Sequence, residues 1–265
     1  MTGSGNDFVM VDGRASGPAE WSVPDIRAVC ARGTGIGADG LVFVAPGAAP
    51  GVVRMAYFNS DGSRAAMCGN AALCSTQLAA RLGLANGRGM SLETDAGTYE
   101  SRCAPGERAE LHLAPVRAPQ QVPGLSVVDG ERRAALAMVG VPHLIVLVDE
   151  VDRVDVARRG SGLRSEPALG PEGANVNFIS PAGTRDGWRM RTYERGVEAE
   201  TLACGTGAVA AACAIQTWGL GTLPATIWTR SGRTLEVRAR QTADGGYEDV
   251  WLVGEARLVF RGVIA

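Results

Sequence analysis

Lysine is absent from this 265-residue sequence, and its absence excludes several kinds of enzyme. A catalytic Schiff base needs a lysine amine, so pyridoxal phosphate enzymes and lysine-dependent aldolases are excluded. A phosphate-binding loop of the GxxxxGK[ST] type also requires lysine and is excluded for the same reason. Acid–base chemistry on an amino acid would therefore have to use other side chains.

The sequence is also poor in metal ligands and in segments suited to membranes or nucleic acid. It has two histidines, His112 and His143, and six cysteines without a CxxC pair, so we expect reduced thiols and no metal site. The formal net charge of −2, without runs of like charge, argues against a nucleic-acid partner. Because there is no apolar stretch of about 18 residues and no N-terminal signal, we expect a cytoplasmic protein without membrane association.

Short apolar runs predict a strand-rich fold with few helices. The runs are rich in β-branched or aromatic residues and end at Gly, Pro, Asp or Asn. Strands are predicted over 7–12, 40–45, 52–58, 109–116, 143–150, 175–180, 188–194, 225–230, 233–240 and 249–260. Helices are predicted over 23–32, 69–84 and 205–220, and the last is apolar along nearly its whole length, which predicts deep burial.

A cysteine followed by glycine opens a predicted helix twice, at Cys68 and Cys204, 136 positions apart. Gly83 and Gly219 end the two helices at the same offset, as glycine commonly does. This agreement indicates a duplication, with the join in the proline-rich stretch 113–124. We expect one domain over 1–117, completed by a C-terminal strand over 255–265, and a second over 118–254.

A thiol at a helix start is suited to proton transfer. The unpaired amides and the helix dipole stabilise a thiolate and lower its pKa from about 8.5. The same amides bind a carboxylate, and glycine lets a ligand approach the backbone closely. Two such thiols on opposite faces of one α-carbon would remove a proton from one face and return one to the other. The pattern predicts a racemase or epimerase that needs no cofactor.

Five ordered motifs carry a resemblance to a known family: GSGNDFVMVD (3–12), GTGIGADGL (33–41), FNSDGSRAAMCGN (58–70), PEGANVNF (171–178) and YERG…ETLACGTGA (193–208). They resemble the diaminopimelate epimerase family. The resemblance implies an α/β fold of the α+β type, with two pseudo-symmetric domains that each wrap a mixed β-sheet around a central helix. It also implies interconversion of LL- and meso-diaminopimelate without a cofactor, in lysine and peptidoglycan precursor biosynthesis, and it permits a homodimer.

The same resemblance assigns roles to individual residues. Cys68 and Cys204 become the acid–base pair, and Arg195 the group that binds the distal carboxylate. The reacting carboxylate is assigned to helix-start residues Gly69, Asn70, Gly205 and Thr206. The ammonium groups and the distal end of the small-molecule substrate are assigned to Asn6, Asn59, Asn175, Glu194 and Arg195.

Three substituted positions and one longer loop depart from the family pattern and keep other functions open. Ala71 and Leu73 replace a glycine and an arginine, Val141 replaces an asparagine expected to reach the substrate, and the loop ERGVEAET is one residue longer. One alternative is a cofactor-independent racemase of a different amino acid, although Asn70 disfavours the proline racemase branch, where histidine is expected. Another alternative is a non-catalytic relative that binds an amino acid.

The remaining notable residues have structural interpretations. Four cysteines, Cys30, Cys74, Cys103 and Cys213, are expected to be structural, and His143 to be a core histidine. The basic cluster formed by Arg153, Arg158, Arg159 and Arg164 lies among acidic residues and is interpreted as a solvated face.

Overall fold

The computed structural model describes residues 1–264, which divide into two compact units. Unit 1 comprises Met1–His112 together with the residues from Val253 onward, and unit 2 comprises Leu113–Leu252. The domain limits expected from the sequence, at 117 and 254, stay a prediction. The chain starts in unit 1, makes the whole of unit 2, and then returns to unit 1.

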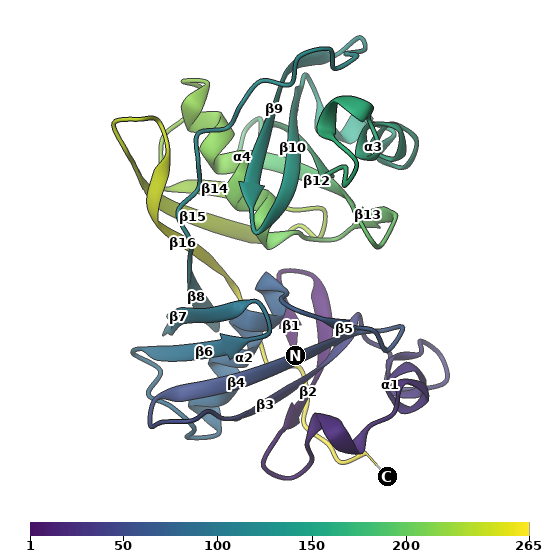
Figure 1. Cartoon of the computed structure of the whole chain (residues 1–265), viewed down its shortest axis with the longest axis vertical. Helices are drawn as coiled ribbons and strands as arrows, with labels where there is room; N and C mark the ends of the chain where they lie inside the picture. The colour runs from purple at the N-terminus through teal and green to yellow at the C-terminus, as the bar shows by residue number, and fades with distance from the viewer. Residues whose placement is uncertain (265) are drawn as a thin grey trace. The chain divides into compact units, whose positions relative to one another are not determined.

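Unit 1 is a mixed sheet with one long helix against it (Figure 1). The strands follow the order β1-β2-β3-β4-β6-β7-β8, and β5 pairs with β4. The β2–β3 and β4–β6 pairs are parallel and the other pairs are antiparallel. The strands are β1 Thr2–Gly3, β2 Asn6–Asp12, β3 Gly40–Pro46, β4 Val52–Asn59, β5 Arg64–Ala65, β6 Met90–Thr94, β7 Gly97–Ala104 and β8 Arg108–Leu113. The helices are α1 Val23–Cys30 and α2 Gly69–Arg81, with a 3₁₀ turn η1 at Pro18–Glu20.

Unit 2 repeats this topology strand for strand. The order is β9-β10-β11-β12-β14-β15-β16, β13 pairs with β12, and the parallel pairs are β10–β11 and β12–β14. The strands are β9 Glu131–Val139, β10 Val141–Val148, β11 Asn175–Pro181, β12 Trp188–Glu194, β13 Ala199–Thr201, β14 Ala225–Trp228, β15 Thr234–Gln241 and β16 Tyr247–Glu255. The helices are α3 Val156–Arg164 and α4 Gly205–Thr217, with 3₁₀ turns η2 at Val151–Arg153 and η3 at Pro167–Leu169. The repeated order supports a duplicated ancestor.

The central helices α2 and α4 match in detail. Each has 13 residues, and each packs against strands on several sides, α2 against β1–β4, β6 and β7, and α4 against β9–β11, β14 and β15. Each is followed, directly after its C-cap residue, by a glycine with positive φ, Gly83 at 69° and Gly219 at 70°. Residues 208–215 of α4 are all buried, as the apolar sequence predicts.

Several predicted elements need correction. The prediction lacks strands β6, β7 and β9. It also lacks helix α3, because α3 contains two glycines and its periodicity is weak. The strand predicted over 109–116 ends at Leu113, just before Pro115, which cannot donate to a ladder. The strand predicted over 249–260 ends at Glu255, after which the backbone of Arg257 bonds to Thr2 in β1.

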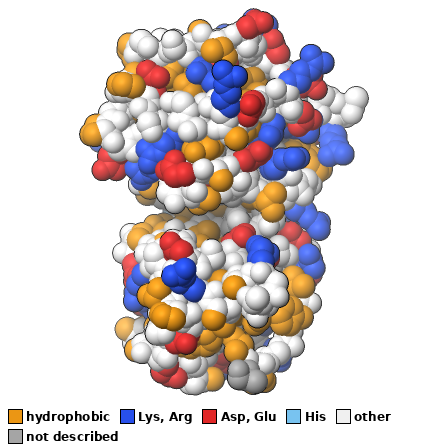
Figure 2. Space-filling model, turned by 90° about the vertical axis from the view of Figure 1, so that its right-hand side faces the viewer, with side chains coloured by type: hydrophobic (Ala, Val, Ile, Leu, Met, Phe, Trp, Pro, Cys, Tyr) orange, Lys and Arg blue, Asp and Glu red, His pale blue; other side chains and the backbone are white. Residues whose placement is uncertain are grey.

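Basic and acidic side chains lie close to one another on the surface. On the face shown in Figure 2, basic and acidic side chains are interspersed. Many arginines form ion pairs with a carboxylate, such as Arg132 with Asp149 at 2.5 Å. Among residues 1–264, no helix has the length and apolar character to cross a bilayer.

Candidate active site

Cys68 lies at the N-cap of α2. Its backbone is extended, with φ −140° and ψ 120°, and its carbonyl accepts the first helical bond, from Ala72 N at 2.9 Å. The Cys68 side chain does not cap the helix, so the first amides, including those of Gly69 and Asn70, keep their capacity to bind an anion. Cys68 is half-buried, which leaves the thiol within reach of a ligand.

Cys204 occupies the same position at the start of α4. Its φ of −132° and ψ of 110° nearly equal those of Cys68, and its carbonyl accepts from Ala208 N at 3.0 Å. The Cys204 Sγ lies 3.7 Å from Thr206 Oγ1, and Gly205 begins the helix as a buried residue. The predicted helix start at both cysteines is therefore confirmed, and each unit presents one thiol in the same local geometry.

Three other thiols have surroundings that oppose ionisation. Burial raises the pKa of Cys74 and of Cys213 to about 12, and burial with the charges of Asp7 and Asp39 raises that of Cys30 to about 11. Desolvation disfavours a thiolate, so these thiols stay protonated at neutral pH. All three belong to the buried core, which agrees with their predicted structural role.

In unit 1 the structure brings Asn6 and Asn70 together. Asn70 Nδ2 donates to Asn6 Oδ1 at 2.6 Å, and Asn6 Nδ2 donates to Asp39 Oδ2 at 3.0 Å. Asp39 also binds Arg32 at 2.8 Å. Because a carboxylate only accepts, this chain fixes both amides and leaves Asn70 Oδ1 as a buried acceptor with no partner among the described residues. Such an acceptor is suited to an ammonium group.

Asn59 lies at the end of β4, where the chain turns towards β5. Its side-chain nitrogen donates to Ser63 Oγ at 3.0 Å, and its backbone nitrogen donates to Ser63 O at 2.9 Å. In this conformation the Asn59 side chain stabilises the turn of residues 59–63, which follows the end of β4.

In unit 2 Asn175 and Arg195 lie side by side. The backbone nitrogen of Arg195 donates to Asn175 Oδ1 at 2.8 Å. The side-chain nitrogen of Asn175, Nδ2, is therefore the atom that Asn175 can use to donate to a ligand. The Arg195 guanidinium lies 3.0 Å from the carboxylate of Glu172, whose side chain is 76% exposed. Glu194 precedes Arg195 as the last residue of β12. A substrate carboxylate that binds Arg195 would therefore compete with an exposed, easily displaced carboxylate.

His143 is fully buried in β10, as its interpretation as a core histidine predicts. Its Nδ1 lies 3.2 Å from Asn177 Nδ2 in the neighbouring strand β11, and Asn177 Oδ1 accepts from Thr192 Oγ1 at 2.9 Å. Burial, with a smaller contribution from the positive charge of Arg195, lowers the pKa of His143 to about 3. The imidazole is therefore neutral at physiological pH.

This pKa makes stability depend on pH. In the unfolded chain a histidine titrates near 6.5, so between pH 6.5 and about 3 the unfolded state binds a proton that the folded state excludes. The unfolding free energy should fall as the pH falls through this window, by about 3 kcal/mol at pH 4.5. Urea unfolding at pH 7 and 4.5 checks this, and His143→Gln should remove most of the difference, whereas His112→Gln should retain it. A His143→Gln protein with the pH dependence of the unmodified chain would contradict the assignment.

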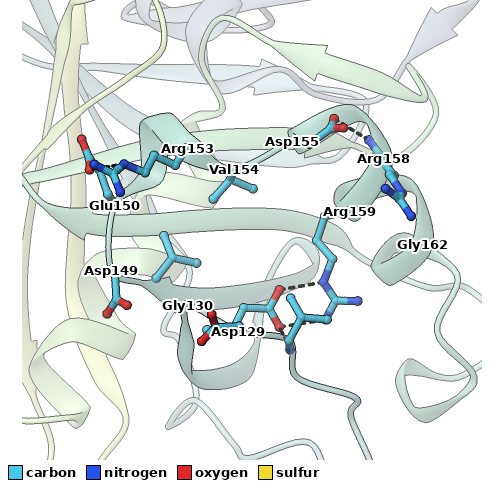
Figure 3. Close-up of a pocket in the computed structure, with 13 residues that line it drawn as sticks. Asp129, Gly130, Asp149, Glu150, Arg153, Val154, Asp155, Arg158, Arg159 and Gly162 are labelled. Carbon is cyan, nitrogen blue, oxygen red and sulfur yellow. Dashed lines mark hydrogen bonds and ion pairs between the residues drawn. The ribbon is translucent and has the colours of Figure 1, made fainter.

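Unit 2 contains a cavity of about 790 Å³ whose lining includes neither Cys204 nor His143. Figure 3 draws the residues that line it. Arg159 and Glu131 both line it, and the Arg159 guanidinium donates two hydrogen bonds of 2.6 and 2.8 Å to the Glu131 carboxylate. The interpretation of the basic cluster as a solvated face holds for Arg153, which is 85% exposed, but is wrong for Arg159 at 23%. Two arginines that line the cavity, Arg153 and Arg159, are paired with Glu150 and Glu131 of the same lining, and the cavity is separate from the predicted site residues.

Two of the departures from the family pattern lie in the protein core. Ala71 and Leu73 are both fully buried in α2, where they contribute to packing and do not reach solvent. Val141 is half-buried at the start of β10, opposite Val139 of β9. Of the three substitutions, Val141 is therefore the one that is placed to alter a ligand contact.

Comparison with known proteins decides the family. The family model described as diaminopimelate epimerase matches residues 1–113 and 135–258. The chain belongs to the diaminopimelate epimerase family. The predicted family and the predicted enzyme class, an isomerase, are thereby confirmed. Relatives named diaminopimelate epimerase occur in Gemmatimonas aurantiaca, 47% identical over all of this chain and 98% of the relative, and in Aquifex aeolicus, 38% identical over 99% and 95%.

Solved structures show the same fold at low sequence identity. A phenazine biosynthesis protein of the PhzF family from Bacillus anthracis superposes with a TM-score of 0.72 at 14% identity, covering 96% of this chain and 92% of that one. A hydroxyproline epimerase from Agrobacterium vitis, with bound trans-4-hydroxy-L-proline, gives 0.61 at 17% identity, covering 87% and 77%. The predicted mixed α/β fold is confirmed.

Sequence reasoning missed four residues of this region, Asp39, Asn177, Thr192 and Gly207. Asp39 accepts a hydrogen bond from Asn6, Asn177 contacts His143, and Thr192 donates to Asn177. A signal was present for Asn177, because it follows Asn175 by two positions and alternate residues of a strand share a face. Gly207 lies within the quoted motif YERG…ETLACGTGA, whereas no comparable signal pointed to Thr192.

Proposed function

We propose that this chain interconverts LL- and meso-diaminopimelate, with Cys68 and Cys204 as the acid–base pair. The observation that carries the proposal is the repeated thiol at the N-cap of a 13-residue helix, one in each unit. Inversion at a stereocentre requires a base on one face and an acid on the other. Family membership supplies the substrate and the place of the reaction in lysine biosynthesis.

The helix starts supply the electrostatic part of this mechanism. Removing an α-proton places negative charge on the adjoining carboxylate, and the amides of the helix-start residues Gly69, Asn70, Gly205 and Thr206 are proposed to stabilise that charge. The thiolate takes the proton from the α-carbon, the electron pair moves into the carboxylate, and the second thiol returns a proton to the opposite face. No cofactor takes part in the proposed steps.

The distal half of the substrate would be held by side chains that the helix starts do not supply. Arg195 is proposed to bind the distal carboxylate after displacing Glu172. Asn6, Asn59, Asn175 and Glu194 are proposed to contact the ammonium groups and the distal end, directly or through Asn70. A cytoplasmic homodimer is part of the proposal, and static light scattering tests the dimer.

The proposal is tested by proton NMR of the reduced protein in D₂O with single stereoisomers of diaminopimelate. We expect the α-proton signal to disappear while signals of the other diastereomer appear. Inversion of a different amino acid, with none of diaminopimelate, would favour the alternative that Val141 keeps open. Binding that raises the unfolding midpoint without any α-deuteration would identify a non-catalytic relative.

A further inference from the structure

The side-chain amide of Asn177 is fixed from every side. Its oxygen accepts from Thr192 Oγ1 at 2.9 Å, and its nitrogen faces both His143 Nδ1 at 3.2 Å and Leu144 O at 3.4 Å. A backbone carbonyl only accepts, so the amide nitrogen must lie on the side of Leu144 and of His143. The flipped amide would place Asn177 Oδ1 against the Leu144 carbonyl oxygen.

This orientation determines the tautomer of His143. With the Asn177 NH₂ group facing it, Nδ1 must accept, and a neutral imidazole then carries its proton on Nε2. His143 Nε2 is buried and has no hydrogen-bond partner among residues 1–264. Unpaired buried donors are rare in folded proteins, and no described residue supplies an acceptor for this N–H.

The same amide also contacts the helix that carries Cys204. A methyl group at Gly207, in the first turn of α4, would collide with Asn177 Oδ1 and would lie 3.1 Å from Cys204 Sγ. Asn177 in β11 is therefore packed directly against the turn that presents the thiol. One buried amide thus touches both the imidazole and the start of the helix.

We propose that Asn177 is a positioning residue, which holds neutral His143 as the Nε2–H tautomer and seats the first turn of α4 that presents Cys204. The part of the proposal that concerns turnover rests on the proposed function. The tautomer is a property of the protein without substrate and can be tested separately.

The first test is ¹⁵N NMR of the histidine side chain in a His112→Gln protein, in which His143 is the only remaining imidazole. At neutral pH we expect a protonated Nε2 and an unprotonated, accepting Nδ1. A protonated Nδ1, or rapid averaging between the two tautomers, would overturn the proposal without any reference to activity.

The second test replaces Asn177 by aspartate in the same background. A carboxylate would accept from Nδ1, so the ring should change to the Nδ1–H tautomer, and kcat should fall by roughly tenfold or more with a smaller change in KM. Asn86→Asp makes the same chemical change in an exposed turn and should leave both readouts unchanged. An unchanged tautomer, or a changed tautomer with an unchanged kcat, would overturn the positioning role. If the unmodified chain fails to epimerise diaminopimelate, the proposed function fails while the tautomer test stands.

Discussion

Replacing either Cys68 or Cys204 by alanine is expected to lower the rate of stereoinversion by about 10³-fold or more. In the proposed mechanism, each variant keeps one thiol at a helix start and loses the group that serves the other face of the α-carbon. Proton exchange without inversion should persist for one stereoisomer only, and the two variants should differ in which stereoisomer exchanges. Deuterium incorporation and diastereomer ratio, followed by proton NMR in D₂O, measure both effects.

The control for this experiment is Cys103→Ala, which removes a half-buried thiol in β7. It should leave inversion within about twofold of the unmodified protein, since a surface-side change away from the site has a small effect. Full inversion by either the Cys68 or the Cys204 variant would contradict the two-base mechanism. Equal exchange of both stereoisomers in one variant would contradict the assignment of one thiol to each face.

Gly207→Ala should be among the most damaging single-methyl changes in unit 2. Alanine normally stabilises a helix interior relative to glycine, but here the methyl group would collide with the Asn177 amide beside Cys204. Overpacking of this kind costs about 1–3 kcal/mol, and displacement of the thiol should also lower turnover by roughly 10²-fold. Urea unfolding and the NMR assay measure the two effects.

Gly162→Ala makes the same change in the interior of α3 and serves as the matched control. A methyl group there meets no atom within 4 Å, so the change should be neutral or stabilise the protein by about 0.5–1 kcal/mol. Turnover should be unchanged. If both variants lose stability equally, the contact with Asn177 does not explain the loss of stability in Gly207→Ala.

The central helices and their thiols could be predicted from the sequence because their signals are local. A Cys-Gly start and a glycine stop recur at the same offset in both halves, and the structure places both cysteines at N-caps. The opposite case is α3, which is held by the N-cap Asp155 and by packing on β12, and which the weak periodicity did not reveal. Tertiary contacts there outweigh the poor helix propensity of Gly160 and Gly162.

The polar networks could not be predicted, because they depend on strand register. Asn177 meets Thr192 as a cross-strand partner in the β11–β12 pair, and it meets His143 across the parallel β10–β11 pair. A shift of one residue in either register would turn Asn177 to the other face of the sheet. The sequence predicts that these strands exist, but their alignment emerges only when the sheet packs on α4.

The return of the chain to unit 1 affects the order in which the protein can fold during synthesis. Thr2 exchanges two backbone bonds of 2.9 Å with Arg257, and Glu107 O accepts from Ala256 N at 2.8 Å. These partners leave the ribosome only after all of unit 2 has been made. Unit 2 gains its last strand, β16, immediately before these partners are made, whereas the first strand made, β1, stays unpaired on one side until then.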